Sequence, residues 1–196
     1  MIISHIIIAT AWILYCVLHS VFASSKFKRF ANDKMGRQYR LYRLYYSVFA
    51  FAGFVLLLFY QITIPSYRFF APNALSLVLG MIIAFSGLLI MSICILKYFM
   101  QLSGLKGLIE NRTSNELMIT GIHRIVRHPL YTGTFIFIWG LLVIFPVASL
   151  LIADMIITIY TLIGLRFEEM KLEREFGEAY KSYKRDVPML IPKLLR

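Results

Sequence analysis

Charged residues and cysteines are scarce in this sequence of 196 residues. Only 16% of the residues are charged, against about 25% in soluble domains, and 59% are hydrophobic. The mean hydropathy of +0.72 excludes an ordinary soluble domain and predicts a protein with several membrane spans. Low-complexity tracts and internal repeats are also absent.

The two cysteines, Cys16 and Cys94, lie far apart in the sequence, each inside an apolar run. A buried thiol in such a run usually behaves as a small hydrophobic side chain. We therefore predict neither a disulfide nor a metal site.

Acidic residues are outnumbered by basic ones, with 10 Asp and Glu against 21 Lys and Arg, so the net charge is +11. A charge of this sign suits either nucleic acid or an anionic membrane surface. The basic residues fall in short segments between apolar runs, where each gains roughly 1 kcal/mol from lipid headgroups. We therefore expect membrane lipids as partners, with no nucleic acid, and infer no obligate protein partner.

The apolar runs predict the number of membrane helices. Residues 2–23, 44–64 and 74–99 each reach the length of about 20 residues that a span needs, and a fourth block, 130–165, is broken near Pro146. If this block forms two helices, the connecting segments and the tail hold seven, one, five, zero and eight Lys and Arg. These counts alternate as the positive-inside rule requires.

We therefore predict an all-α polytopic membrane protein with five transmembrane helices, its N-terminus outside and a C-terminal cytosolic or interfacial helix. The fourth helix should have about 15 to 17 residues. The charged segment after Leu165 should be helical, loosen at Gly177 and end before Pro188. Asp154, inside the last apolar run, should form an inter-helix hydrogen bond or be protonated, because an unpaired carboxylate is costly there.

The stretch GIHRIVRHPLYTG, residues 121–133, gathers charged groups between two apolar runs. Pro129 disfavours helical backbone at His128 and suits the first position of a helix. Arg127 and His128 should therefore lie at the N-terminal end of a membrane helix, where free N–H groups favour an anion. A guanidinium there suits a carboxylate or phosphate, and His123 and Arg124 can add to the pocket. The alternative is that these residues only anchor the helix to the lipid interface.

Glu168 and Glu169 are adjacent, so on a helix their side chains point about 100° apart and only one can face inward. The inward one should meet a cation, a ligand hydroxyl or an amine. The other should be solvated or paired with Arg166 or Lys171. A ligand with both a carboxylate and an amine would match Arg127 on one side and a glutamate on the other.

The ordered set TGIHRIVRHPLYTG and EEMKLEREFGEAYKSYKRDVPMLIP resembles the integral-membrane methyltransferases, which include isoprenylcysteine carboxyl methyltransferases and phospholipid methyltransferases. The N-terminal stretch WILYCVLHSVFASSKFKRF is similar to the start of bacterial methanethiol S-methyltransferases. One departure is His123, where many members of the family carry Tyr.

The resemblance implies that residues 101–196 bind S-adenosyl-L-methionine and that residues 1–100, a three-helix part, contact the acceptor. It also implies a bacterial inner membrane, with the active site facing the cytoplasm. The acceptor would reach the site from the membrane, with a thiol favoured over an isoprenylcysteine carboxylate or a phospholipid amine. The cofactor-binding residues implied are Gly121, Ile122, His123, Arg127, His128, Pro129, Tyr131, Gly133, Glu168 and Glu169.

Methyl transfer to a thiol or an amine requires that the acceptor lose a proton. His19 or His128 could accept it, although His19 could equally be a helix histidine with a structural hydrogen bond. A carboxylate acceptor needs no base, and Arg127 or Arg124 would steer it instead. Gly133, Gly140 and Gly164 are expected to permit close helix contact.

Two other functions stay open. Sterol reductases resemble this family in their C-terminal helices and use NADPH, whose 2′-phosphate would suit a basic pocket, but they are longer and have more spans. A non-enzymatic lipid-binding or assembly protein would instead tolerate substitution of Arg127, His128 and Glu169.

Overall fold

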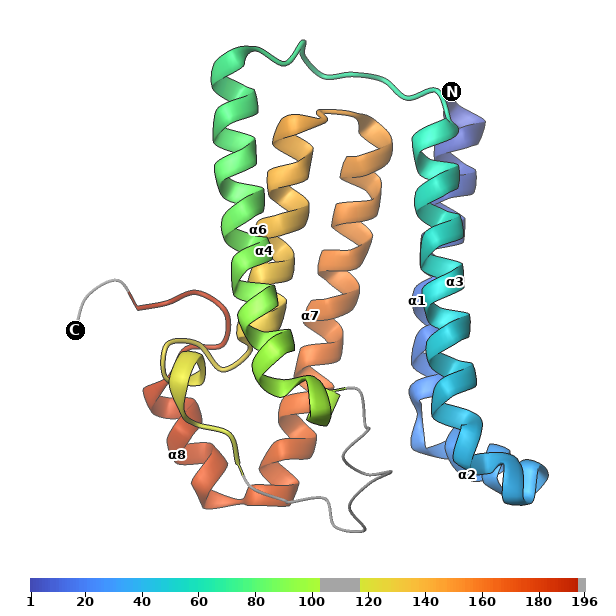
Figure 1. Ribbon diagram of the computed structural model, residues 1–196, viewed down its shortest axis with the longest axis vertical. Coiled ribbons are helices and arrows are strands. Elements are labelled where there is room, and N and C mark those ends of the chain that lie inside the picture. Colours follow the sequence, from blue (N-terminus) through green and yellow to red (C-terminus); the bar gives the residue numbers. More distant parts are fainter. Residues whose placement is uncertain (103–116, 194–196) are drawn as a thin grey trace. The chain divides into compact units, whose positions relative to one another are not determined.

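The computed structural model describes residues 1–102 and 117–193, so part of the basic segment 97–129 lies outside the described residues. Within these ranges the regular structure is helical, with one isolated bridge between Arg68 and Val147. The all-α class is thus confirmed (Figure 1). In chain order the elements are α1 (Ile2–Ala23), α2 (Ser25–Met35), η1 (Gly36–Leu41), α3 (Tyr42–Thr63), α4 (Ala74–Leu102), η2 (Gly121–Arg124), α6 (Pro129–Ile144), α7 (Ala148–Phe176) and α8 (Glu178–Asp186).

Among the described residues, four helices are long and apolar enough to cross a membrane: Ile2–Ala23, Gln38–Thr63, Ala74–Lys97 and Ala148–Phe176. Helix α6 is apolar but has only 16 residues, which agrees with the short helix predicted. Phe145–Val147 separates α6 from α7, so the predicted break at Pro146 is confirmed. The count of five spans and the outside N-terminus stay predictions.

The chain forms two compact units, and helix α7 contributes to both. The first unit consists of residues 1–71 and 146–160, the second of residues 72–145 and 161–196. Helix α4 therefore groups with the C-terminal elements by its contacts. The functional division at residue 100 stays a prediction.

The first unit has a small core in which Ile8 and Trp12 of α1 pack against Ala153 of α7. The Trp12 indole Nε1 donates a 2.8 Å hydrogen bond to Oε1 of Gln61 on α3, so neither buried polar group is left unsatisfied. Asp154 is also buried, and its Oδ2 has no hydrogen-bond partner among the described residues. The inter-helix hydrogen bond and the protonated carboxyl both stay predictions for Asp154.

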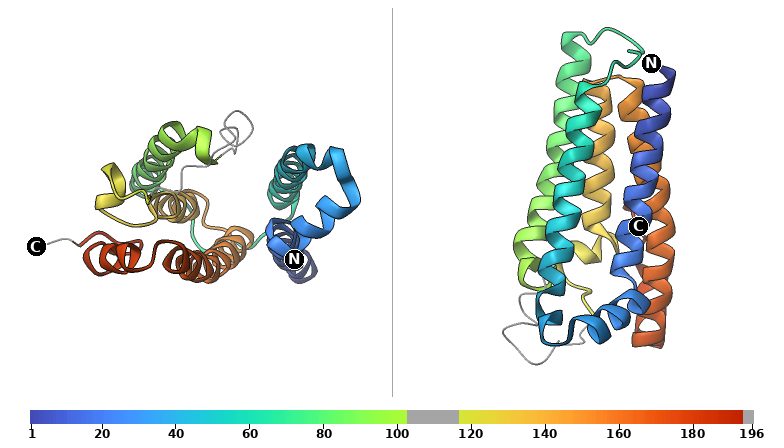
Figure 2. Two further views of the ribbon diagram at one scale, coloured as in Figure 1. Left: turned by 90° about the horizontal axis from the view of Figure 1, so that it is seen from below. Right: turned by 90° about the vertical axis from the view of Figure 1, so that its right-hand side faces the viewer.

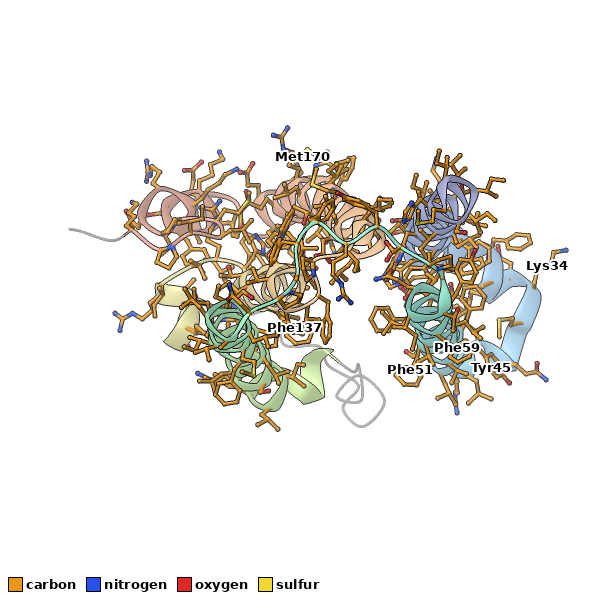
Figure 3. All side chains as sticks on the ribbon, turned by 90° about the horizontal axis from the view of Figure 1, so that it is seen from above. Lys34, Tyr45, Phe51, Phe59, Phe137 and Met170 are labelled. Carbon is orange, nitrogen blue, oxygen red and sulfur yellow. The ribbon has the colours of Figure 1, made fainter. Side chains whose placement is uncertain are left out.

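Helix α3 presents large aromatic side chains outward, as Figure 3 shows for Tyr45, Phe51 and Phe59. Phe51 is 70% exposed and Phe59 63% exposed. Side chains of this kind are stable in that position when lipid replaces water around the helix. The apolar exterior of α3 therefore agrees with a membrane span.

Helix α2 was missed by the sequence analysis, which treated residues 24–43 as a basic connecting segment. Ser24 caps this helix, because its hydroxyl accepts a 3.2 Å hydrogen bond from the Phe27 N–H. The helix is amphipathic: Ala31 is buried, and Lys34 projects outward (Figure 3). A capped helix thus carries part of the basic charge that follows α1.

In the second unit α4 and α6 touch through glycines. A Cβ at Gly87 would lie 2.6 Å from the Gly133 carbonyl oxygen, and one at Gly140 would lie 2.9 Å from Cα of Ala84. The predicted close contacts at Gly133 and Gly140 are confirmed. The prediction at Gly164 is wrong for the part of the chain that the structure describes, because a Cβ there would meet none of those residues within 4 Å.

Helix α7 continues without a break from the apolar run into the charged segment and ends at Phe176. Gly177, with φ +54°, then separates α7 from α8, and α8 ends at Asp186. The predicted loosening at Gly177 and the end before Pro188 are confirmed. The charged part, however, begins as a direct extension of a membrane helix, and only α8 is a separate one.

We expect Gly87→Ala to lower the free energy of unfolding by about 1–3 kcal/mol, because the new methyl group collides with backbone atoms of α6. Gly164→Ala is the matched control, since its methyl group has open space. Thermal unfolding of both variants in detergent measures the difference. Equal midpoints for the two variants would contradict close packing of α4 on α6.

Candidate functional site

The site in the second unit is built around the start of α6. His128 is the N-cap residue, with φ −123° and ψ 65°, and Pro129 is the first residue of the helix, as the sequence predicted. Arg127, His128 and Pro129 are all buried. The RHP segment, residues 127–129, is therefore fixed in place by the fold.

Glu169 of α7 is the carboxylate that faces this segment. Its Oε1 accepts a 2.7 Å hydrogen bond from Arg127 Nε and lies 2.6 Å from Arg127 Nη2 and 3.2 Å from His128 Nε2. Lys184 Nζ lies 3.4 Å from the other oxygen, Oε2. A buried charge needs such partners, because an isolated one would lose its hydration without compensation. The prediction that one glutamate meets a cation is confirmed at Glu169.

Glu168 is exposed and accepts a 3.3 Å hydrogen bond from the hydroxyl of Tyr131. Glu168 is therefore solvated, one of the two predicted alternatives, and its hydrogen bond comes from Tyr131. Tyr131 is the third residue of α6. Glu168 and Glu169 therefore contact neighbouring residues at the same end of that helix. The N-terminal end of α6 thus contacts the C-terminal half of α7.

The chain beyond α8 also binds the RHP segment. The backbone N–H of Arg127 donates to Pro188 O at 2.8 Å, and that of His128 donates to Met189 O at 3.1 Å. Thr132 Oγ1 donates to Leu190 O at 2.8 Å. The Nη1 group of Arg127 donates to the carbonyl oxygens of Lys184 and Val187. Residues 187–190 therefore form a strap along the RHP segment.

Helix η2 precedes the RHP segment and lies beside α8, as Figure 1 and the left view of Figure 2 show. The Tyr183 hydroxyl of α8 donates a 2.6 Å hydrogen bond to the His123 carbonyl oxygen. Gly121 has φ +63°, and a Cβ there would lie 2.6 Å from Nζ of Lys97. Ile122 is half-buried and Arg124 is exposed.

The imidazole of His123 is half-buried among positive groups. Burial, followed by the charges of His128 and Lys97, holds its pKa below the ordinary value of 6.5. Each of these influences opposes adding another positive charge. The positive charges nearby would also attract an anion, whereas burial would disfavour it as it disfavours the imidazolium.

Tyr180 of α8 is a site residue to which the sequence reasoning gave no role. It is 1% exposed, and its hydroxyl makes no hydrogen bond of acceptable geometry with the described residues. Burial and then the Glu169 carboxylate raise its pKa, which places the hydroxyl close to that carboxylate. The only sequence signal was the Tyr180–Tyr183 spacing, which puts both rings on one face of a helix.

His19 belongs to the first unit, whereas Arg124 and Arg127 belong to the second. The hydroxyl of Tyr46 lies 3.0 Å from Nε2 of His19 and 3.1 Å from its Nδ1. The rings of Tyr15 and Tyr160 surround the imidazole at centroid distances of 6.0 and 6.5 Å. His19 thus has a structural partner and also sits in an aromatic cluster.

The comparison with known proteins covers this same part of the fold. A family model described as phospholipid methyltransferase matches residues 74–179, just over half of the chain. The chain belongs to the phospholipid methyltransferase family. The matched range contains α4, η2, α6 and α7, and it includes every predicted cofactor-binding residue.

Individual relatives are methanethiol S-methyltransferases. One from Bradyrhizobium diazoefficiens is 28% identical over 186 residues, covering 91% of this chain and 64% of the relative. One from Crocosphaera subtropica is 46% identical over 70 residues, covering 36% of this chain and 27% of the relative. The chain thus spans less than two thirds of the length of these relatives. No solved structure matches it.

We expect Glu169→Gln to destabilise the protein by about 3–5 kcal/mol, because it leaves the buried Arg127 charge uncompensated. Glu168→Gln is the matched control, and this exposed change should stay within about 0.5 kcal/mol. Thermal unfolding in detergent compares the two variants. A larger loss at Glu168 would contradict the assignment of the inward carboxylate.

Proposed function

We propose that this chain is an S-adenosylmethionine-dependent methyltransferase whose acceptor is a small thiol. The family is named for methyl transfer, and the relative that matches 91% of this chain is named methanethiol S-methyltransferase 1. The observation that carries the proposal is the Arg127–His128–Glu169 cluster at the start of α6, inside the matched range. The reductase and lipid-binding alternatives have no comparable support.

The described residues fit the proposed cofactor. S-adenosylmethionine carries a carboxylate, an amine and a positively charged sulfur. Lys97 supplies a positive group beside Gly121, and Glu168 and Tyr131 supply an exposed carboxylate and an aromatic ring. The space above Gly121 is a cradle that a side chain would fill, since a Cβ there would lie 2.6 Å from Lys97 Nζ.

The predicted cofactor-binding residues then fall into two groups with different roles. Gly121, Ile122, His123, Tyr131 and Glu168 offer half-buried or exposed groups to a ligand. Arg127, His128, Pro129, Gly133 and Glu169 are buried and hold the segment in place. In this proposal Arg127 shapes the pocket, because its guanidinium already binds Glu169 and two carbonyl oxygens.

When bound, the cofactor supplies a methyl group attached to a positively charged sulfur. A thiol with an ordinary pKa of about 8.5 is mostly protonated at neutral pH, so the protein has to take its proton. We assign this role to His19: its imidazole would accept the proton as the thiol S–H bond breaks, which would leave the bonding electron pair on the acceptor sulfur. Tyr46 would hold the ring in position for this transfer.

We also propose five membrane spans, of which the short α6 is the fourth, with the site on the cytoplasmic side of a bacterial inner membrane. The support is the alternation of Lys and Arg along the connecting segments. A small or lipophilic acceptor would then reach the site from the membrane.

The purified protein in detergent should bind S-adenosylhomocysteine saturably and should not bind NADPH, as measured by calorimetric titration. With a radiolabelled methyl donor, methanethiol should be methylated in preference to prenylcysteines and phospholipids. Binding of NADPH without S-adenosylhomocysteine would overturn the proposal, and preferred labelling of phospholipid would overturn its thiol part.

His19→Gln should lower kcat for methanethiol at pH 7 by about 10²-fold or more, because general-base transfer is lost. Its affinity for S-adenosylhomocysteine should be unchanged, and raising the pH should restore part of the rate by ionising the thiol. His5→Gln is the control, since His5 lies on the same helix and binds Ser66 instead. If the rate of His19→Gln stays equally low when the pH is raised, His19 is not the base.

A further inference from the structure

Helix η2 is a short turn whose own hydrogen bonds are local. The His123 N–H donates to the Thr120 carbonyl oxygen at 3.3 Å, and the Ile125 N–H donates to that of Ile122 at 3.1 Å. Bonds between residues three apart set the shape of a turn. They do not fix where the turn lies against the other helices of the unit, so its position depends on contacts with other elements.

Tyr183 of α8 makes such a contact. Its hydroxyl donates a 2.6 Å hydrogen bond to the carbonyl oxygen of His123, and the two residues are 60 positions apart in the sequence. The bond is partly buried, so water competes with it less than at an exposed site. Because η2 runs only from Gly121 to Arg124, this bond fixes the main chain directly beside the cradle at Gly121.

The ring of Tyr183 is supported by Tyr180 of the same helix. The two ring centroids lie 6.0 Å apart and the ring planes meet at 64°, an edge-on arrangement that aromatic pairs favour. Tyr180 is 1% exposed, so the atoms packed around it hold its ring in place. Tyr183 therefore presents its hydroxyl to η2 from a supported position.

Helix α8 is in turn fastened to the buried ion pair. Arg127 Nη1 donates a 3.0 Å hydrogen bond to the carbonyl oxygen of Lys184, the residue that follows Tyr183. The Nζ atom of Lys184 lies 2.8 Å from Glu173 Oε1 on α7. Contacts with the RHP segment and with α7 thus determine where α8 lies, and the Tyr183 hydroxyl connects η2 to it.

We propose that Tyr183 is a positioning residue for the methyl donor, because its hydroxyl holds η2 where residues 121–123 can receive the cofactor. The inference rests on the proposed function and extends it to a residue that acts through the main chain of η2. A ligand's affinity falls with the fraction of molecules in which its site is in place, and the bond from Tyr183 to His123 keeps that fraction high. The alternative is that this bond only stabilises the fold.

The test is steady-state kinetics of Tyr183→Phe with methanethiol as the acceptor. The substitution removes the hydroxyl and keeps the ring, so the contact with Tyr180 is retained. We expect KM for S-adenosylmethionine to rise about three- to tenfold, the range that corresponds to the loss of one hydrogen bond between uncharged groups. S-adenosylhomocysteine should bind more weakly by the same factor in calorimetric titration. At saturating donor, kcat should stay close to that of the unsubstituted protein.

Hydrogen exchange gives a second reading of the same variant. Without ligand, the amides of η2 should exchange faster in Tyr183→Phe than in the unsubstituted protein, whereas those of α6 should not change. Saturating S-adenosylhomocysteine should remove the difference, because the ligand itself then holds η2 in place.

Tyr42→Phe is the matched control. The Tyr42 hydroxyl also donates a partly buried hydrogen bond to a main-chain carbonyl oxygen, that of Phe22, but this bond lies in the first unit. The control should leave KM for S-adenosylmethionine and the affinity for S-adenosylhomocysteine unchanged. Thermal unfolding in detergent compares the stability of the two variants.

A bond that only stabilises the fold gives a different result. Tyr183→Phe would then reduce the fraction of active enzyme, so kcat would fall while KM for the donor stayed the same. That outcome, a variant that fails to fold, an unchanged variant, or an equal rise of the donor KM in Tyr42→Phe would each overturn the inference and leave the proposed function standing. If the unsubstituted protein neither binds S-adenosylhomocysteine nor transfers a methyl group, the proposed function fails and this inference fails with it.

Discussion

The architecture of the second unit depends on one buried ion pair. Arg127 and Glu169 are each less than 10% exposed, so neither charge is stable without the other. The pair joins the start of α6 to the C-terminal half of α7. The Nη1 group of Arg127 also donates hydrogen bonds to the carbonyl oxygens of Lys184, near the end of α8, and of Val187. Three segments distant in sequence thus meet at one side chain, and the half-buried groups on η2 and α6 take their positions from it.

Local signals made much of this fold predictable. Pro129 marks the first residue of α6, Pro146 lies in the break before α7, and Gly177 separates α7 from α8. The 3.6-residue repeat was enough to show that only one of two adjacent glutamates could be buried. Each of these features is decided by the residue itself or by its immediate neighbours, and this is the information that a single sequence contains.

What was missed depends on contacts between distant residues. The strap at 187–190 binds through main-chain carbonyl groups. Every residue has such a group, so the residue types in this segment could not predict the contact. Lys97 and Tyr180 become notable only once the fold brings them to Gly121 and Glu169. Gly164 was misjudged because a glycine in a helix looks the same in sequence whether it faces another helix or open space. Helix α2 was overlooked because its basic residues were counted only as a topological signal.

The strap has a consequence for biosynthesis. Arg127 is translated 60 residues before Val187 and 42 residues before Glu169, so it is synthesised before either partner exists. During that interval the guanidinium can form hydrogen bonds only with lipid headgroups and water. The contacts that fix the depth of α6 in the membrane are not yet present. The contacts that hold the start of α6 can therefore form only after the strap has been synthesised. A translational stall within the last charged segment would leave a membrane-inserted chain without a finished site.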